Sequence, residues 1–239
     1  MLPSLSIIIP VLNEAHNVGT ICREIEQQSI SAQEVIIVDG GSTDETKQIF
    51  DKTVYKVISS ERGRGNQIFA GAQEASGDII FIMHADMQLE PHVFKDIAEV
   101  MINPTIMGGC VGAHFSCTSL KFRIIRWINI LRVKLMGISF GDQGQFFRRV
   151  PGMKENWLPA IPLMEDVELS LRMNKAGKTI MLKGGIIAST RRWDEHNIWL
   201  NAFQVLCLLS KYLFLRKTKK DFCTEAFYRA YYKKPLKKK

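Results

Sequence analysis

The sequence lacks the features of a disulfide-bonded or secreted protein. It has only five cysteines in 239 residues, an odd number, and no two of them form a C-x-x-C pair. Widely spaced cysteines favour free thiols in a reducing compartment over a disulfide scaffold or a cysteine-based zinc site. The N-terminus runs from Met1 into an apolar strand without a cationic segment or a small-residue cleavage site, so we expect no secretory signal.

The sequence also lacks internal repeats, and its net positive charge is concentrated at the C-terminal end. The net charge is +8, but residues 211–239 contain eleven Lys/Arg and two acids, so this tail carries +9 and the rest of the chain −1. We therefore expect the tail to attract something other than the substrate of the main domain. The length and the hydrophobic content of 46% fit one large globular domain or two small ones.

Short apolar, β-branched runs alternate with helical patterns along the first half. The strands expected there are residues 6–10, 34–39, 55–58 and 78–83, and the helices are 14–28 and about 65–77. The second half is less regular, with expected strands at 109–115, 145–149, 179–182 and 186–188, and helices at 120–136, 165–175 and from about 198. The alternation predicts an α/β fold with a mainly parallel sheet.

Polar side chains follow three of the expected strands. Asn13 and Glu14 follow the first strand, Asp39 ends the second, and His84 and Asp86 follow the fourth. In parallel sheets, ligands bind at the carboxyl ends of the strands. One acid in such a place could simply cap a helix, but acids at three strand ends favour a binding site.

Four segments, in order, resemble inverting family 2 glycosyltransferases. They are SIIIPVLNE at 6–14, EVIIVDGGSTD at 34–44, ASGDIIFIMHAD at 75–86 and the ED pair at 165–166. The resemblance covers roughly residues 4–193 and is strongest to small bacterial members with HAD in place of D-x-D. It implies a single GT-A (Rossmann-like) domain over residues 1–196 and transfer of a sugar from a nucleotide-diphosphate donor to a hydroxyl acceptor, with inversion. Residues 197–239 would form a helical, basic extension.

The resemblance also implies a donor site around the first two strands. Its expected nucleotide-sugar-binding residues are Pro10, Val11, Leu12, Glu14, Asp39, Gly41, Arg64, Ala85 and Asp142. Asp39 would accept hydrogen bonds from the base or the ribose, since a carboxylate only accepts. The alternative for Asp39 is an acid that forms the turn before two glycines. Arg64 stands in a GRG segment that lacks the third glycine of a dinucleotide fingerprint, so the segment alone is a weak signal.

The metal motif departs from the family pattern. Asp86 would hold Mn²⁺ or Mg²⁺ against the donor diphosphate, because hard cations prefer oxygen ligands. His84 replaces the first carboxylate, so the cation could be bound by His84, by Asp86 alone, or only together with the donor. His196 is a further candidate ligand. A helix-capping Asp86 beside a core His84 is the structural alternative.

The resemblance assigns the catalytic role to the ED pair and to RRW at 191–193. Asp166 would be the general base that takes the proton of the acceptor hydroxyl. Glu165 should point elsewhere, because neighbours on a helix diverge by about 100°. Without the resemblance, both acids could simply begin a helix at its positive end. Arg192 could offset diphosphate charge, and Trp193 could stack on a sugar or pack as core.

Two segments raise the question of a membrane. Residues 120–136 combine a broad apolar helical face with five Lys/Arg and no acid, which suits either a membrane surface or a core helix with a solvated face. Residues 198–215 are apolar but interrupted, so an interfacial helix or a homo-oligomer contact fits better than a span of about 20 residues. With the basic tail, they predict a cytoplasmic protein held peripherally at the inner face of the cell membrane, with a lipid-linked or membrane-proximal acceptor.

Three other functions stay open from the sequence. A nucleotidyltransferase also places acids at strand ends, but usually has a glycine-rich loop where this chain has Pro10 to Asn13. A non-enzymatic protein that binds nucleic acid or membranes would explain the basic tail but not the acids, so we expect no nucleic-acid partner. A degenerate transferase could bind the donor without turnover, given His84.

Overall fold

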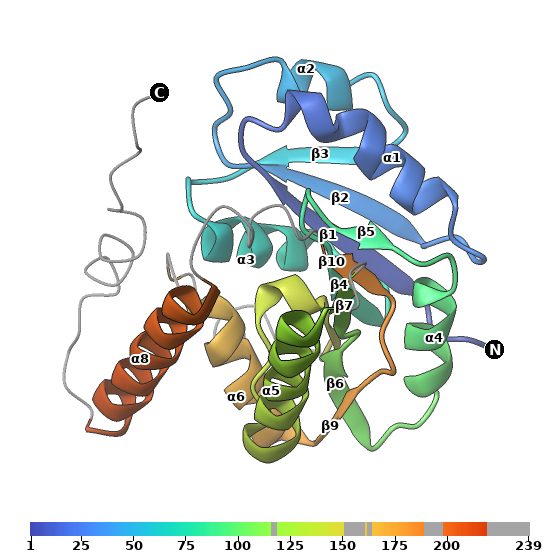
Figure 1. The fold of residues 1–239 in the computed structure, drawn as a ribbon. Coiled ribbons are helices and arrows are strands. Elements are labelled where there is room, and N and C mark those ends of the chain that lie inside the picture. The colour runs from blue at the N-terminus through green and yellow to red at the C-terminus, as the bar shows by residue number, and fades with distance from the viewer. Residues whose placement is uncertain (116–118, 151–160, 162–163, 189–197, 219–239) are drawn as a thin grey trace.

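The protein forms an α/β sandwich around a seven-stranded sheet in a computed structural model, which describes residues 1–115, 119–150, 161, 164–188 and 198–218 (Figure 1). The sheet has the order β3-β2-β1-β4-β8-β6-β9, and a smaller sheet has the order β5-β10-β7. The strands of the large sheet are β1 (Leu5–Val11), β2 (Glu34–Asp39), β3 (Lys56–Ser59), β4 (Ile79–Ile82), β6 (Ile106–Cys110), β8 (Gln145–Arg148) and β9 (Lys178–Met181). The small sheet contains β5 (Gln88–Leu89), β7 (Ala113–Phe115) and β10 (Ile186–Ala188).

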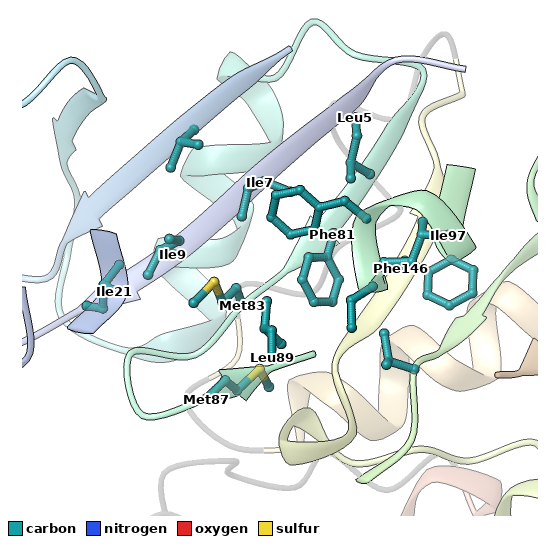
Figure 2. Close-up of a cluster of buried hydrophobic side chains, with 14 of the residues drawn as sticks. Leu5, Ile7, Ile9, Ile21, Phe81, Met83, Met87, Leu89, Ile97 and Phe146 are labelled. Atoms are coloured by element: carbon teal, nitrogen blue, oxygen red, sulfur yellow. The ribbon is translucent and has the colours of Figure 1, made fainter. Parts of the chain in front are cut away.

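Helices cover both faces of the large sheet. They are α1 (Val18–Glu26), α2 (Thr46–Phe50), α3 (Arg64–Glu74), α4 (Val93–Val100), α5 (Leu120–Met136), α6 (Glu165–Ala176) and α8 (Ile198–Lys217), with short 3-10 turns η1 (Ala15–Asn17) and η2 (Gly141–Gln143). Side chains of α1, α2 and α4 join one core cluster, which Figure 2 shows around Phe81. Side chains of α3 and α6 join the cluster on the opposite face. Ile7, Ile8 and Ile9 of β1 are fully buried, which explains why this strand is apolar without alternation.

The predicted α/β class and mainly parallel sheet are confirmed. Of the large sheet's pairs among the described residues, only those of β8 with β4 and β6 are antiparallel. Two predicted elements differ. The helix expected from Glu14 begins only at Val18, because Asn13 adopts a left-handed φ of 57° and a 3-10 turn follows. The strand expected over 109–115 is two strands, because Gly112 (φ 84°) turns the chain from the large sheet into the small one.

Helix α8 packs on the body of the fold. Leu209 and Tyr212 join a buried cluster with Val167 of α6, and Arg216 bonds the carboxylate of Glu168 at 2.8 Å. No helix within the described ranges is both long and apolar enough to cross a membrane. The described cysteines Cys22, Cys110 and Cys207 are free thiols. The boundary predicted between residues 196 and 197 stays a prediction.

Candidate functional site

The candidate site lies at the edge where the parallel strands β1, β2 and β4 end. Since β8 runs antiparallel to β4, its first residue, Gln145, lies at this same edge. The Gln145 amide donates to the Asp166 carbonyl at 2.9 Å and to the Ser170 hydroxyl at 3.0 Å. These bonds fix the first turn of α6 against the strand ends. The fold thus brings residues about 150 positions apart in the sequence to one edge.

Asp39 has a structural role in the turn after β2. Its buried carboxylate accepts the backbone N–H of Gly41 at 3.0 Å and of Ser42 at 3.1 Å. Gly41 has a φ of 87°, which favours glycine. The Ser42 hydroxyl in turn accepts the N–H of Asn13 at 2.9 Å and so links this turn to the loop after β1. The turn-forming role considered for Asp39 is therefore present, and its contact with a nucleotide stays a prediction.

Gln67 is a buried residue of α3 that the sequence analysis did not single out. Its amide nitrogen donates to the carbonyls of Val11 and Val38, both at 2.8 Å, and so ties together the ends of β1 and β2. Of the predicted donor contacts in this loop, Pro10 and Val11 are buried, whereas Leu12 and Glu14 are half-buried. Any contact of a nucleotide with Pro10 or Val11 would therefore involve the backbone more than the side chain.

Gly141 lies between two of the predicted functional side chains. A Cβ atom added at Gly141 would be 2.7 Å from Nε2 of His84 and 3.6 Å from Oδ2 of Asp166. The Gly141 N–H also donates to that same Oδ2 at 2.8 Å. His84 after β4, Gly141 in η2 and Asp166 in α6 therefore converge. The second carboxylate oxygen, Oδ1, accepts the N–H of Val167 at 2.7 Å, which orients the carboxylate.

The imidazole of His84 is neutral at physiological pH. Desolvation by the surrounding protein, together with the positive charge of Arg64, lowers the pKa of His84 to about 3. A neutral imidazole can act as a hydrogen-bond partner or metal ligand but adds no positive charge to the site. Its Nε2 lies close to Gly141, so His84 packs against η2.

Replacing Gly141 with alanine should disturb this convergence. The new methyl group would overlap the His84 ring, so we expect a loss of about 1–3 kcal/mol in the free energy of unfolding, as for other overpacked sites. Gly19→Ala in α1 is the matched control, because an added Cβ there meets no atom within 4 Å. Since alanine is favoured over glycine inside a helix by up to about 1 kcal/mol, this variant should be at least as stable as the wild type. Urea denaturation measures both. Equal stability of the Gly141→Ala variant and the wild type would show that η2 is not packed as described.

Glu165 forms an ion pair with Arg64 of α3, whereas the Asp166 carboxylate accepts backbone N–H groups, so the two neighbouring acids have different partners. Only 4% of Glu165 is exposed, and its Oε2 has no hydrogen-bond partner among the described residues. Burial raises the pKa of Glu165 to about 7; Arg64 opposes this increase and Asp166 adds to it. Met164, just before, adopts a left-handed φ of 68°, which is uncommon for a residue other than glycine.

A Glu165→Gln variant tests this carboxyl through the pH dependence of stability. The pKa of Glu165 is about 7 in the folded protein, against an ordinary value of 4.5. The folded state therefore favours the protonated carboxyl, and the resulting contribution to the free energy of unfolding is fully present below pH 4.5 and is lost as the pH rises through 7. Glutamine does not ionise. The free energy of unfolding of the variant minus that of the wild type should therefore rise by about 3 kcal/mol between pH 4.5 and pH 8. Urea denaturation over this range measures it, and a difference independent of pH would contradict the raised pKa.

Asp142 lies among charged groups in η2. Surrounding protein atoms raise its pKa by desolvation, although the residue keeps contact with solvent. Arg132 and Arg64 oppose the increase, while the carboxylates of Asp166 and Asp86 add to it. Asp142 is therefore close enough to the predicted base and to the predicted metal ligand to interact with both electrostatically.

Arg132 of α5 is a buried cation that sequence reasoning did not assign to the site. Its Nη2 donates to the Gln143 side chain at 2.6 Å, and its Nε donates to the Ile138 carbonyl at 3.2 Å. Its guanidinium also lies 3.4 Å from the centre of the Phe140 ring. Arg132 therefore holds η2 and the segment before it in place. Only the spatial contact reveals this role, because in the sequence nothing distinguishes Arg132 from the two other arginines of the helix.

The residues at this edge suit a divalent cation only if the donor supplies further ligands. Asp86 is exposed and close enough to Asp142 to influence its pKa. Within the described part of the chain, however, no group of three or more His, Cys, Asp or Glu side chains is placed to hold a metal ion. Ala85 between the two motif residues is buried. The predicted residues Arg192, Trp193 and His196 lie outside the described residues.

Comparison with known proteins identifies one sequence family over the larger part of the chain. The model of the family described as "Glycosyl transferase family 2" matches residues 6–154. Two similar proteins bear the name undecaprenyl-phosphate 4-deoxy-4-formamido-L-arabinose transferase. The one from Sodalis glossinidius is 26% identical over 155 residues (60% of this chain, 48% of that protein), and the one from Yersinia enterocolitica is 27% identical over 158 residues (60% and 47%). The chain spans about half the length of these relatives.

Solved structures share the fold. The mannosyltransferase PcManGT from Pyrobaculum calidifontis, in complex with GDP-Man and Mn²⁺, has a TM-score of 0.63 at 20% identity, over 79% of this chain and 57% of that one. Residues 1–349 of TarS from S. aureus, in complex with UDP-GlcNAc, have a TM-score of 0.59 at 19% identity, over 78% and 58%. The predicted GT-A architecture is therefore confirmed.

Proposed function

Because the chain belongs to glycosyl transferase family 2, we propose that it moves a sugar, with inversion, from a nucleotide-diphosphate donor to a hydroxyl acceptor. We further propose that the acceptor is lipid-linked or close to a membrane. The relatives named as undecaprenyl-phosphate transferases support this acceptor class, and the GDP-Man and UDP-GlcNAc in the similar structures support the donor class.

In this proposal, the donor lies across the ends of β1, β2 and β4. The loop after β1 and the turn at Asp39 border the nucleoside, and Asp86 together with the donor diphosphate holds Mn²⁺ or Mg²⁺. When bound, such a cation would offset the negative charge that develops on the leaving diphosphate. Arg64 contributes positive charge at the same edge while it pairs with Glu165.

Asp166 takes the proton of the acceptor hydroxyl. Its carboxylate is oriented by two backbone N–H groups and lies beside His84 and Gly141. A positioned carboxylate is the group that an inverting transfer requires on the face opposite the leaving diphosphate. The buried Oε2 of Glu165 can accept a hydrogen bond from a sugar or acceptor hydroxyl, which would satisfy its unpaired oxygen.

The convergence of His84, Gly141 and Asp166 at the end of β4 carries the proposal. The test incubates the full chain and Mn²⁺ with UDP-Glc, UDP-GlcNAc or GDP-Man. A detergent-dispersed bacterial lipid extract serves as the source of lipid-linked hydroxyl acceptors, and undecaprenyl phosphate, which would react through a phosphate oxygen, is assayed separately. We expect one donor to release its nucleoside diphosphate only with acceptor, and the product to show the inverted anomeric configuration by NMR.

A parallel incubation with nucleoside triphosphates and sugar phosphates, beside the transfer assay, separates the rival functions. Release of pyrophosphate from a nucleoside triphosphate and a sugar phosphate would indicate a nucleotidyltransferase. Binding of the donor without release under any of these conditions would indicate a degenerate transferase. Either result would contradict the proposed transfer.

A further inference from the structure

The outer face of α5 is apolar and open to solvent. The residues exposed on this helix include Leu120, Ile124, Trp127, Ile128, Leu131 and Leu135. Trp127 is 65% exposed and Leu135 is 76% exposed. A continuous patch of such large apolar side chains is unusual on a protein surface that faces water. These are the residues of the apolar face seen in the sequence, and a core helix would have buried them. The side that faces the protein instead carries Phe122, Ile125 and Arg132.

Cations accompany this apolar face. Lys121, Arg123, Arg126 and Lys134 of the same helix are exposed, and the sequence has no acid between Glu99 and Asp142. A surface that combines apolar side chains with cations alone matches the interface of an anionic lipid bilayer, where acyl chains and phosphate groups lie a few ångströms apart.

We infer that the outer face of α5 docks on the surface of an anionic lipid bilayer. A second copy of this chain is a poorer occupant, because a two-fold interface on this helix would bring like charges of the two copies together. A bilayer surface satisfies both components of the face at once.

The inner side of α5 connects this surface to the candidate site. Arg132 holds the Gln143 side chain of η2, whose Gly141 bonds the carboxylate of Asp166. One helix diameter, about 10 Å, therefore separates the docking face from the loop beside the predicted base. The inference rests on the proposed function in one respect: docking here would bring a membrane-borne acceptor toward Asp166.

Vesicle sedimentation without donor or acceptor tests the docking face. The full chain is incubated at low salt with equimolar phosphatidylcholine–phosphatidylglycerol vesicles or with pure phosphatidylcholine vesicles. We expect binding to the anionic vesicles that falls at least about tenfold in Trp127→Ser/Leu131→Ser and in Arg123→Glu/Arg126→Glu. Fluorescence quenching by brominated lipid should be weaker in Trp127→Phe than in the wild type.

Matched variants on other surfaces control for general effects. Val54 and Ile102 are exposed apolar residues elsewhere, and Lys52 and Lys175 are exposed cations elsewhere. Val54→Ser/Ile102→Ser and Lys52→Glu/Lys175→Glu should bind vesicles like the wild type.

Three results would overturn the inference. The first is equal vesicle binding by the α5 variants and the wild type, which would assign the binding to other segments such as the basic tail. The second is an equal loss of binding in the control variants. The third is a dimer in solution that only the α5 variants disrupt. Because no donor or acceptor is present, failure of the proposed transfer would leave the vesicle result unchanged. Conversely, the α5 variants should keep activity on a detergent-dispersed acceptor.

Discussion

Replacing Asp166 with asparagine is expected to lower the turnover rate by about 10²–10⁴-fold, the usual contribution of a general base. Asparagine has nearly the same shape but cannot take a proton from the acceptor hydroxyl. Its side chain can still accept one of the two backbone N–H bonds from Gly141 and Val167. The donor should therefore bind nearly as well as in the wild type, while acceptor-dependent release of nucleoside diphosphate measures the loss of rate.

Glu168→Gln is the control for a general effect on α6. Glu168 lies in the same first turn, but its carboxylate bonds Arg172, Arg216 and Tyr212 away from the site. Those arginines lower the pKa of Glu168 despite its burial. This variant should lose stability and keep its turnover number. A rate loss in Glu168→Gln as large as in Asp166→Asn, or full activity of Asp166→Asn, would contradict the role of Asp166 as base.

Replacing Asp86 with asparagine is expected to remove the stimulation of transfer by Mn²⁺. An amide is a weaker ligand for a hard cation than a carboxylate, and no described group of three acids or histidines can replace it. Stabilisation of the leaving group by a cation contributes several kcal/mol, so kcat/KM should fall by about 10²–10³-fold. Because Asp86 is exposed, the melting temperature without ligand should change little. A Mn²⁺ titration of the initial rate measures the effect.

Asp51→Asn is the control for loss of one negative charge. Asp51 is exposed after α2, and its replacement should leave the Mn²⁺ response intact. If Asp86→Asn kept the response of the wild type, the cation would be held by other residues.

The first half of the fold could be predicted because its signals are local. The strands β1, β2 and β4 are short apolar runs that end in turn residues, and their observed bounds lie within about a residue or two of those expected. The acids that follow them could be assigned to one edge, since parallel strands share an edge for their carboxyl ends. Local pattern missed the delayed start of α1, which follows from the left-handed conformation of Asn13.

The remaining parts of the site depend on long-range contacts. Nothing near Gln67 or Gln145 in the sequence indicates that each amide bonds elements far along the chain. The ion pair of Arg64 with Glu165 spans 101 positions, and the close approach of the Gly141 backbone to the His84 ring is visible only in the three-dimensional structure. These contacts explain why the motif residues converge, but their partners could not be read from periodicity or spacing.

Helix α5 shows the limit of amphipathic patterns. The sequence predicted its bounds and its apolar face, yet it allowed this face to point either into the core or toward a membrane. In the structure, Phe122 and Ile125 pack inward and the broader face with Trp127 points outward. A periodic pattern defines faces of a helix, whereas tertiary packing decides which of them the protein covers.

A thermal-shift panel with UDP-, GDP- and dTDP-sugars, each with and without Mn²⁺, tests the central claim most directly. A ligand that binds only the folded state at 100 times its Kd adds about 2.7 kcal/mol of stability. For a chain of this size, that raises the melting temperature by about 5–10 °C. We predict that sugars of one nucleotide class give such a shift, larger with Mn²⁺ than without. No shift with any donor, with or without Mn²⁺, would contradict the nucleotide-sugar site at the ends of β1, β2 and β4.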